Sequence, residues 1–203
     1  MGKLIIINGS PRAPRSNSKR YADLFKACWV ETVDEYSVTS KKHASVCQTL
    51  GSYSDVLLVF PLYADGIPVT LMHFLKEWEL HKLPASPMIH VLINCGFLEP
   101  EQNETACEMI RLFCRQNGLT LGSTLCIGSG EAILDTPFSF LVRRKIKRLA
   151  DSIRRKSPRQ LKVTMPLPPS LFVRASTNYW TQYGAKNQLT REEMETMSIE
   201  GSM

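Results

Sequence analysis

The residues with the clearest capacity for chemistry lie in the segment 8–18, which reads NGSPRAPRSNS. It combines hydroxyl and amide side chains with two arginines, and an apolar run at residues 4–7 precedes it directly. From Ser16 onwards the apolar residues have helical spacing, so the segment leads into a helix N-terminus. Free backbone N–H groups, the helix dipole and Ser or Asn side chains together suit a phosphate. The alternative is a helix that is merely well capped, and this segment alone favours neither.

The same segment excludes two common nucleotide-binding motifs. It contains neither the G-x4-G-K-[ST] pattern of P-loop NTPases nor the G-x-G-x-x-G pattern of dinucleotide-binding domains. A mononucleotide phosphate therefore fits the segment better than ATP or a pyrophosphate.

Three further short segments could receive a flat ring. Pro-Leu-Tyr at residues 61–63 follows an apolar run and offers a stiff apolar edge with an aromatic face. Asn-Cys-Gly at residues 94–96 follows a second apolar run, and Gly-Ser-Gly at residues 128–130 follows a third. Glycines at these places allow a ligand or a neighbouring loop to approach closely.

Alternating strand-like and helix-like segments position these loops. Strand-like runs lie at residues 4–8, 30–38, 55–60, 88–94 and 119–127, and helical spacing at residues 16–29, 42–50, 68–81, 101–117 and 138–156. Several of the strand-like runs are apolar on both faces, as in a parallel sheet covered by helices on both sides. The pattern predicts an α/β fold with an open, doubly wound, five-stranded parallel sheet in the order 2-1-3-4-5. Ligands of such sheets bind at the carboxyl ends of the strands.

The composition changes after residue 157. Prolines between residues 166 and 169 predict a short extended linker, and residues 170–186 again have helical spacing. Thr190 and Glu193 form a capping box for a last short helix. We therefore expect a domain at residues 1–157 and a helical C-terminal extension at residues 158–203, which packs on the main body or on a second subunit.

Composition limits the remaining function classes. The chain has 203 residues, of which 43% are hydrophobic and 22% charged, and no apolar run approaches the roughly 18 residues of a membrane span. Without a signal-peptide pattern, a cytoplasmic protein with no membrane partner is expected. The six cysteines include no C-x-x-C pair and the histidines show no convincing metal spacing, so we expect neither a metal nor an iron–sulfur cluster.

The net charge of +6 arises partly from nine Lys or Arg within residues 143–159. Such a stretch could bind nucleic acid. However, Ile146, Leu149 and Ile153 recur there at helical spacing, so a solvated face of an amphipathic helix is the simpler interpretation. No nucleic-acid partner is expected.

These motifs together make the chain resemble the flavodoxin-like, NADPH-dependent FMN reductases. The resemblance covers about residues 3–155 and lies in the segments 9–12 and 16–18, the turn at 61–63 with the Ile-Pro pair at 67–68, and the Gly-Phe pair at 96–97. It implies FMN as the cofactor. The residues it implies are Ser10, Arg12, Ser16, Asn17 and Ser18 for the phosphate; Pro61, Leu62, Tyr63, Ala64 and Asp65 for the isoalloxazine; and Asn94, Cys95 and Gly96 for its pyrimidine side, with Gly128 at a point of close approach.

The resemblance also implies an activity: transfer of hydride from NADPH or NADH to FMN, and then reduction of a small acceptor such as a quinone, a nitro or azo compound, or a flavin. Members are often dimers, so a homodimer or higher homo-oligomer is expected. No catalytic residue is assigned; Tyr63 is the nearest candidate for an acid, although packing against the ring is the commoner role. Two alternatives remain open, namely a flavodoxin-type electron carrier, which would usually be acidic, and a non-catalytic flavin-binding module.

Overall fold

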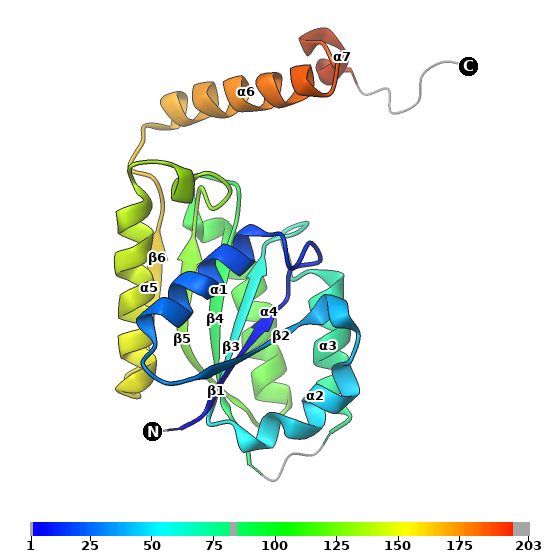
Figure 1. Ribbon diagram of the computed structural model, residues 1–203, viewed down its shortest axis with the longest axis vertical. Coiled ribbons are helices and arrows are strands. Elements are labelled where there is room, and N and C mark those ends of the chain that lie inside the picture. The colour runs from blue at the N-terminus through cyan, green and yellow to red at the C-terminus, as the bar shows by residue number, and fades with distance from the viewer. Residues whose placement is uncertain (1, 82–84, 197–203) are drawn as a thin grey trace, which may run out of the picture. The chain divides into compact units, whose positions relative to one another are not determined.

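The structure is a computed structural model that describes residues 2–81 and 85–196. Two compact parts divide the chain, the first ending at Met165 and the second beginning at Pro166. The first part is built on a parallel sheet in the order β2-β1-β3-β4-β5-β6 (Figure 1). Its strands are β1 (Leu4–Asn8), β2 (Val33–Ser37), β3 (Asp55–Pro61), β4 (Met88–Asn94), β5 (Thr120–Ile127) and β6 (Gln160–Val163).

Helices cover both faces of this sheet. They are α1 (Asn17–Cys28), α2 (His43–Thr49), α3 (Val69–Glu79), α4 (Glu104–Gln116) and α5 (Ser139–Arg154). Helices α1 and α5 pack together on one face, while α2, α3 and α4 cover the other (Figure 1). Strands β1, β3 and β4 therefore have both faces buried, and nearly every residue in them is apolar, as predicted from their continuous apolar runs.

Aromatic side chains hold the face covered by α2, α3 and α4. Phe74 and Trp78 of α3 have ring centroids 6.1 Å apart, and Trp78 lies 5.8 Å from Phe113 of α4, both in edge-to-face geometry. Tyr36 of β2 lies 5.7 Å from Phe74. This row of rings joins the edge strand β2 to helices α3 and α4. These two helices begin directly after the loops that follow β3 and β4.

The prediction of five strands is wrong, because a sixth strand continues the sheet. Strand β6 pairs in parallel with β5, with Val163 opposite Ile127. The order of the first five strands, 2-1-3-4-5, is the predicted one. Strand β6 has only four residues and lies at an edge, with Gln160 and Lys162 exposed, so its sequence lacks the apolar run that marks the other strands.

The second part of the chain contains two helices, α6 (Pro169–Lys186) and α7 (Arg191–Glu195). The predicted capping box is present: Oγ1 of Thr190 accepts from the amide of Glu193 at 3.2 Å, and the carboxylate of Glu193 accepts from the amide of Thr190 at 2.7 Å. On α6, the rings of Tyr179 and Trp180 lie 5.2 Å apart. Across the residues described, no helix combines the length and apolar character needed to span a membrane.

Candidate functional site

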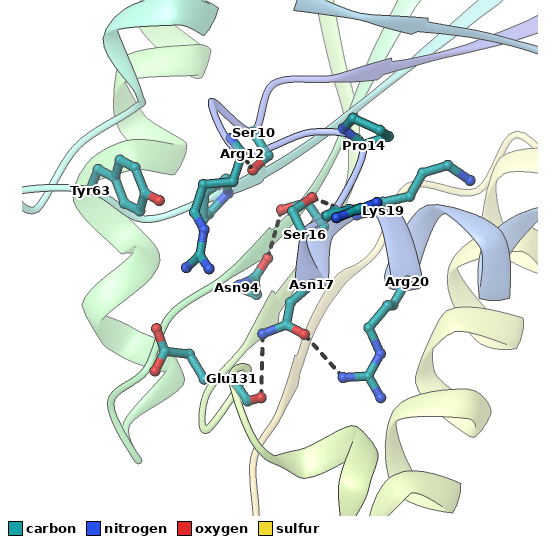
Figure 2. A pocket seen from close by; sticks show the side chains of 13 residues that line it. Ser10, Arg12, Pro14, Ser16, Asn17, Lys19, Arg20, Tyr63, Asn94 and Glu131 are labelled. Atoms are coloured by element: carbon teal, nitrogen blue, oxygen red, sulfur yellow. Dashed lines mark hydrogen bonds between the residues drawn. The ribbon is translucent and has the colours of Figure 1, made fainter. Parts of the chain in front are cut away.

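A cavity of about 380 Å³ opens at the carboxyl ends of β1, β3 and β4. It lies beside the boundary of β1 and β3, where the order of the strands reverses and where doubly wound sheets bind their ligands. Side chains from α1 and from the loops after the strands point into it (Figure 2). Its lining residues are Ser10, Arg12, Pro14, Arg15, Ser16, Asn17, Ser18, Lys19, Arg20, Pro61, Tyr63, Asn94 and Glu131.

The N-terminus of α1 forms one wall of this cavity. Ser16 is the N-cap residue, and its Oγ accepts a hydrogen bond from the amide of Lys19 at 3.2 Å. The first amides of the helix, those of Asn17 and Ser18, have no intrahelical carbonyl to pair with, and the helix dipole concentrates positive charge around them. This wall therefore favours an anion.

Two guanidinium groups add to this positive charge. Within the described ranges, neither Arg12 nor Arg15 lies in ion-pair distance of a carboxylate, whereas Lys19 pairs with Asp23 and Arg20 pairs with Asp135. A guanidinium presents a planar fork of donors that matches the oxygens of a phosphate. Arg12 and Arg15 are therefore available to a ligand, while the other two cations in the cavity are already neutralised.

Contacts between α1 and the segment that follows β5 fix the opposite wall. Arg20 forms two hydrogen bonds to the carboxylate of Asp135, at 2.9 and 2.5 Å. These bonds lower the pKa of the Asp135 carboxyl. The hydroxyl of Tyr21 donates to the carbonyl oxygen of Gly130 at 2.6 Å, and burial raises the pKa of that hydroxyl. Two parts of the chain that are far apart in sequence are thereby joined beside the cavity.

Ser18 and Asn94 interact directly at the floor of the cavity. The hydroxyl of Ser18 donates to Oδ1 of Asn94 at 3.1 Å, and both side chains are buried. Because the hydroxyl hydrogen of Ser18 is used in this bond, Ser18 orients Asn94 and leaves its Nδ2 as the group able to donate to a ligand.

The loop after β3 forms a tight turn at the rim. Tyr63 and Gly66 exchange backbone hydrogen bonds of 3.1 and 3.0 Å, which places Ala64 and Asp65 at the two central positions. Ala64 and Asp65 have φ values of 46° and 55°, in the left-handed region that residues with a side chain seldom adopt. Strained backbone of this kind is often found in ligand-binding loops.

A second and largely apolar cavity of about 690 Å³ lies beside this turn. Tyr63 lines both cavities and is 42% exposed. A flat ring resting on Tyr63 would thus have polar groups on one side and apolar surface on the other. The second cavity is lined by Pro11, Tyr63, Ala64, Asp65, Gly66, Ile67, Pro68, Val69, Thr70, Met72, Thr105 and Met109.

The loops after β4 and β5 pack closely against each other. A Cβ atom on Gly128 would lie 2.5 Å from the carbonyl oxygen of Leu98, so glycine is required for this approach. Cys95 is also buried between these loops, and its burial raises the pKa of the thiol. Close approach at Gly128 therefore serves loop packing.

The predicted site residues divide into three groups. The first cavity gathers Ser10, Arg12, Ser16, Asn17, Ser18, Pro61, Tyr63 and Asn94. Ala64 and Asp65 line the second cavity. Leu62, Cys95, Gly96 and Gly128 line neither.

Sequence reasoning missed several lining residues, among them Arg20 and Glu131. Arg20 is one helical turn beyond Ser16, so its position on the same face of α1 could have been inferred from spacing. Glu131 directly follows the Gly-Ser-Gly turn after β5, and its place at the strand's carboxyl end was the available signal.

The donor groups of the first cavity suit a phosphate monoester, and its aromatic rim suits a flat ring. Arg12, Ser16 and Asn17 contribute guanidinium, hydroxyl and amide groups to the lining, and Pro61 and Tyr63 contribute their rings. Over the described ranges, no cluster of three or more His, Cys, Asp or Glu side chains is arranged to hold a metal ion.

Sequence comparison gives no relative for this chain: no family model matches it, and no curated protein matches it either. Solved structures do share its fold. An FMN-dependent NADH-azoreductase from Bacillus anthracis str. Ames Ancestor, in complex with FMN, matches with a TM-score of 0.58 and 12% identity, over 75% of this chain and 99% of the azoreductase.

Two other solved structures extend this result. An NAD(P)H:quinone oxidoreductase from Methanothermobacter marburgensis matches with a TM-score of 0.58 and 11% identity, over 76% of this chain and 98% of its own. A flavodoxin from Streptococcus pneumonia TIGR4 matches with a TM-score of 0.56 and 18% identity, over 75% of this chain and 99% of its own. At these identities the likeness establishes the flavodoxin-like fold.

Proposed function

We propose that this protein is an FMN-dependent NAD(P)H oxidoreductase and that FMN occupies the first cavity. The observation that carries the proposal is that Arg12 and Arg15, which pair with no carboxylate of the described residues, share a cavity with the start of α1 and with Tyr63. A ligand with a phosphate at one end and a flat ring at the other would satisfy both ends of the site. The volume of about 380 Å³ lies within the range of about 300–1,000 Å³ found for small-molecule sites.

We assign the phosphate of FMN to the α1 end of the cavity. Arg12, Ser16 and Asn17 would donate to its oxygens, together with the first amides of the helix. The hydroxyl of Ser10 accepts from the amide of Arg12 at 3.3 Å and so keeps its own hydrogen for a phosphate oxygen. Ser18 would act indirectly, by orienting Asn94.

We assign the isoalloxazine ring to the turn after β3 and to Asn94. Pro61 and Tyr63 would contact the ring, and Nδ2 of Asn94 would donate to one of its acceptor atoms. The amides of Ala64 and Asp65 are not used in the pairing of Tyr63 with Gly66 and could donate to the ring edge.

The predicted residues that line neither cavity would hold the loops around the site in place rather than contact the flavin. Leu62 is buried, and its amide donates to the carbonyl oxygen of Asn94 at 2.8 Å, which ties the turn to β4. The amide of Cys95 donates to the carbonyl oxygen of Ile127 at 3.0 Å, and Gly128 permits the two loops to meet. Gly96 would leave the pyrimidine side of the ring free of a side chain.

Bound FMN would supply the hydride and electron transfer, which amino-acid side chains cannot perform. The residues of the chain would bind the phosphate, orient the ring and leave the ring face that is turned away from Tyr63 open to a nicotinamide and then to an acceptor. We propose NADPH or NADH as reductant and a quinone, nitro compound, azo compound or flavin as acceptor. The azoreductase and the quinone oxidoreductase among the structures of the same fold support this acceptor class.

The proposal is tested by the visible spectrum of the purified protein, before and after addition of NADPH without oxygen. After loading with FMN, bands near ~370 and ~450 nm should appear and then bleach. Replacing Arg12 and Arg15 by Ala should weaken FMN binding by about tenfold or more, because two charge-assisted contacts are lost. Replacing Arg143 and Arg144 of α5 by Ala removes the same charge from an exposed surface and is the matched control. A protein that binds no FMN would overturn the proposal.

An electron carrier or a non-catalytic flavin-binding module is the second candidate, favoured by the flavodoxin of the same fold. The net charge of +6 argues against a carrier of the usual acidic type. A bound flavin that NADPH does not bleach, but that a chemical reductant does, would favour this second candidate.

We also propose that the protein forms a cytoplasmic homodimer or higher homo-oligomer. Val69 of α3 and Leu112 of α4 are 64% and 44% exposed, which leaves apolar surface available on two neighbouring helices. Light scattering during size-exclusion chromatography should give a mass of at least twice 23.0 kDa. A monomeric mass at micromolar concentration would contradict this assembly.

A further inference from the structure

Two cysteines on neighbouring elements lie in direct contact. The Sγ atoms of Cys107 on α4 and Cys126 on β5 are 3.7 Å apart, within the distance of an S–H···S hydrogen bond. Both side chains are buried, with exposed fractions of 8% and 5%. All six cysteines of the chain are free thiols in the structure, so the contact is not a disulfide. It joins two nucleophilic groups that the proposed function does not use.

The thiol pair lies one strand in from the edge of the sheet. Cys126 is opposite Lys162 of the edge strand β6 in the parallel register, so both side chains point to the same face of the sheet. The ammonium of Lys162 pairs with Glu104 of α4 at 2.6 Å and with Glu101 at 3.2 Å, and all three side chains are exposed. The thiols are therefore close to solvent, beside a long and exposed lysine side chain, and a small solute can reach them.

The contact makes these two thiols chemically different from other buried cysteines. Burial raises the pKa of Cys47 to about 12 and that of Cys114 to about 11. In the pair, the hydrogen bond from Cys126 lowers the pKa of Cys107 in spite of its burial, and the same bond raises the pKa of Cys126. A thiolate is the nucleophile in thiol oxidation, so Cys107 is the more reactive of the two.

The geometry suits a disulfide. The sulfur atoms of a disulfide are about 2.05 Å apart, so the two Sγ atoms have to approach by about 1.7 Å, shared between two side chains. We propose that Cys107 and Cys126 are a modification site, at which hydrogen peroxide forms a reversible disulfide that ties α4 to β5. This inference goes beyond the proposed function and does not require a flavin in the first cavity.

The reaction takes place in two steps. The thiolate of Cys107 attacks one oxygen of hydrogen peroxide, the O–O bond breaks, and the hydroxide that leaves takes up the proton lost by the thiol. The resulting sulfenic acid is attacked by the thiol of Cys126, so that the S–S bond forms, the S–O bond breaks and water leaves. In total, the two thiols lose two electrons and two protons, and one peroxide is reduced to two molecules of water.

The experiment treats the full chain with hydrogen peroxide, unfolds it, blocks the remaining thiols with iodoacetamide and maps its peptides by mass spectrometry. We expect a pair of peptides linked through Cys107 and Cys126, about 2 Da lighter than the sum of its two parts and absent after reduction with dithiothreitol. Cys47 and Cys114 serve as internal controls in the same digest, and both should carry the alkyl group.

Two variants test whether the contact selects the pair. Cys107→Ala should form no linked peptides with Cys126. Cys114→Ala removes a buried thiol of the same helix and should form the link as wild type does, so it is the matched control. Oxidation should raise the unfolding temperature of wild type by about 5 °C or more, because the bond closes a loop of the unfolded chain, and should not raise that of Cys107→Ala. Circular dichroism confirms that each variant is folded.

The other outcomes contradict the inference. Wild-type protein whose two thiols are still alkylated after peroxide treatment would overturn it. A link of Cys126 to Cys95, or a link between two chains through Cys28, in place of the expected one would also overturn it, since the contact would then not determine the product. An unfolding temperature that stays the same or falls on oxidation would contradict the tie between α4 and β5. The proposed function is tested separately, by the flavin spectrum.

Discussion

His90 donates a hydrogen bond from Nε2 to Oδ1 of Asp55 at 3.0 Å and thereby links the neighbouring strands β4 and β3. The other ring nitrogen of His90, Nδ1, accepts from the amide of Ser123 at 2.9 Å. Both nitrogens of a buried imidazole are therefore satisfied, and the proton is on Nε2. The second bond reaches β5 at a place where the register of β4 and β5 shifts by one residue.

This pair makes folding stability depend on pH in the acid range. Burial alone would raise the pKa of Asp55, but hydrogen bonds from His90 and Ser54 outweigh it, so the net pKa is lowered. A carboxyl with a lowered folded-state pKa contributes stability above its ordinary pKa of about 3.9 and loses it as the pH falls through the folded value. We expect Asp55→Asn to cost about 1–2 kcal/mol at pH 7 and much less near pH 3. Urea unfolding of both proteins at the two pH values measures this, and a constant difference would contradict it.

Gly122 is required for the ring of His90 to fit. A Cβ atom on Gly122 would lie 2.4 Å from Cε1 of His90, whose two hydrogen bonds prevent it from moving aside. We expect Gly122→Ala to destabilise the protein by about 2 kcal/mol or more, as overpacking in a core does. Thermal unfolding measures the loss. The control is Gly118→Ala, whose Cβ would meet no atom within 4 Å, so any cost there comes from its φ of 63° alone.

Negative charge at the start of α1 should prevent FMN binding. Ser16→Glu removes the N-cap hydroxyl and places a carboxylate where the phosphate is assigned. We expect FMN retention to be lost, with a stability cost of about 1 kcal/mol from the cap. Ser139→Glu adds the same charge at the start of α5 and should retain FMN. The measurement is the FMN content of each folded variant. Unchanged FMN content in Ser16→Glu would contradict the assignment of the phosphate to this loop.

The turn after β3 is expected to be more stable with glycine. Ala64 adopts a φ of 46°, which costs a residue with a Cβ about 1–2 kcal/mol, and glycine avoids this cost but loses more entropy on folding. The net effect of Ala64→Gly should be a gain of up to about 1 kcal/mol. Chemical denaturation measures it, and a loss of stability would mean that other contacts hold Ala64.

The first five strands and the loops of the site could be predicted because each rests on local pattern, whereas the strand order was chosen among the orders of doubly wound sheets. Continuous apolar runs marked β1, β3 and β4, and the rule that parallel strands end at one edge brought Ser16, Tyr63 and Asn94 to one cavity. Strand β6 could not be predicted this way, because an edge strand of four residues needs no apolar run.

Contacts between distant residues were beyond such reasoning. The bond of Ser18 to Asn94 and the pairing of Arg20 with Asp135 depend on how α1 packs beside the segment after β5. A spacing pattern shows which residues share a helix face, but not which carboxylate or amide the face will meet. Glu131 is a different case, because its place directly after β5 was visible in the sequence and was not used.

The hydrogen bonds between α1 and the segment after β5 affect how much conformational entropy is lost when a ligand binds. On that side, hydrogen bonds at Arg20, Tyr21 and Asn17 already hold the wall in place, so binding should cost little conformational entropy there. Among the residues that the structure describes, the guanidinium groups of Arg12 and Arg15 have no such partners, and a ligand would have to immobilise them itself. Affinity should therefore depend more on the flexibility of these two side chains than on the rest of the cavity.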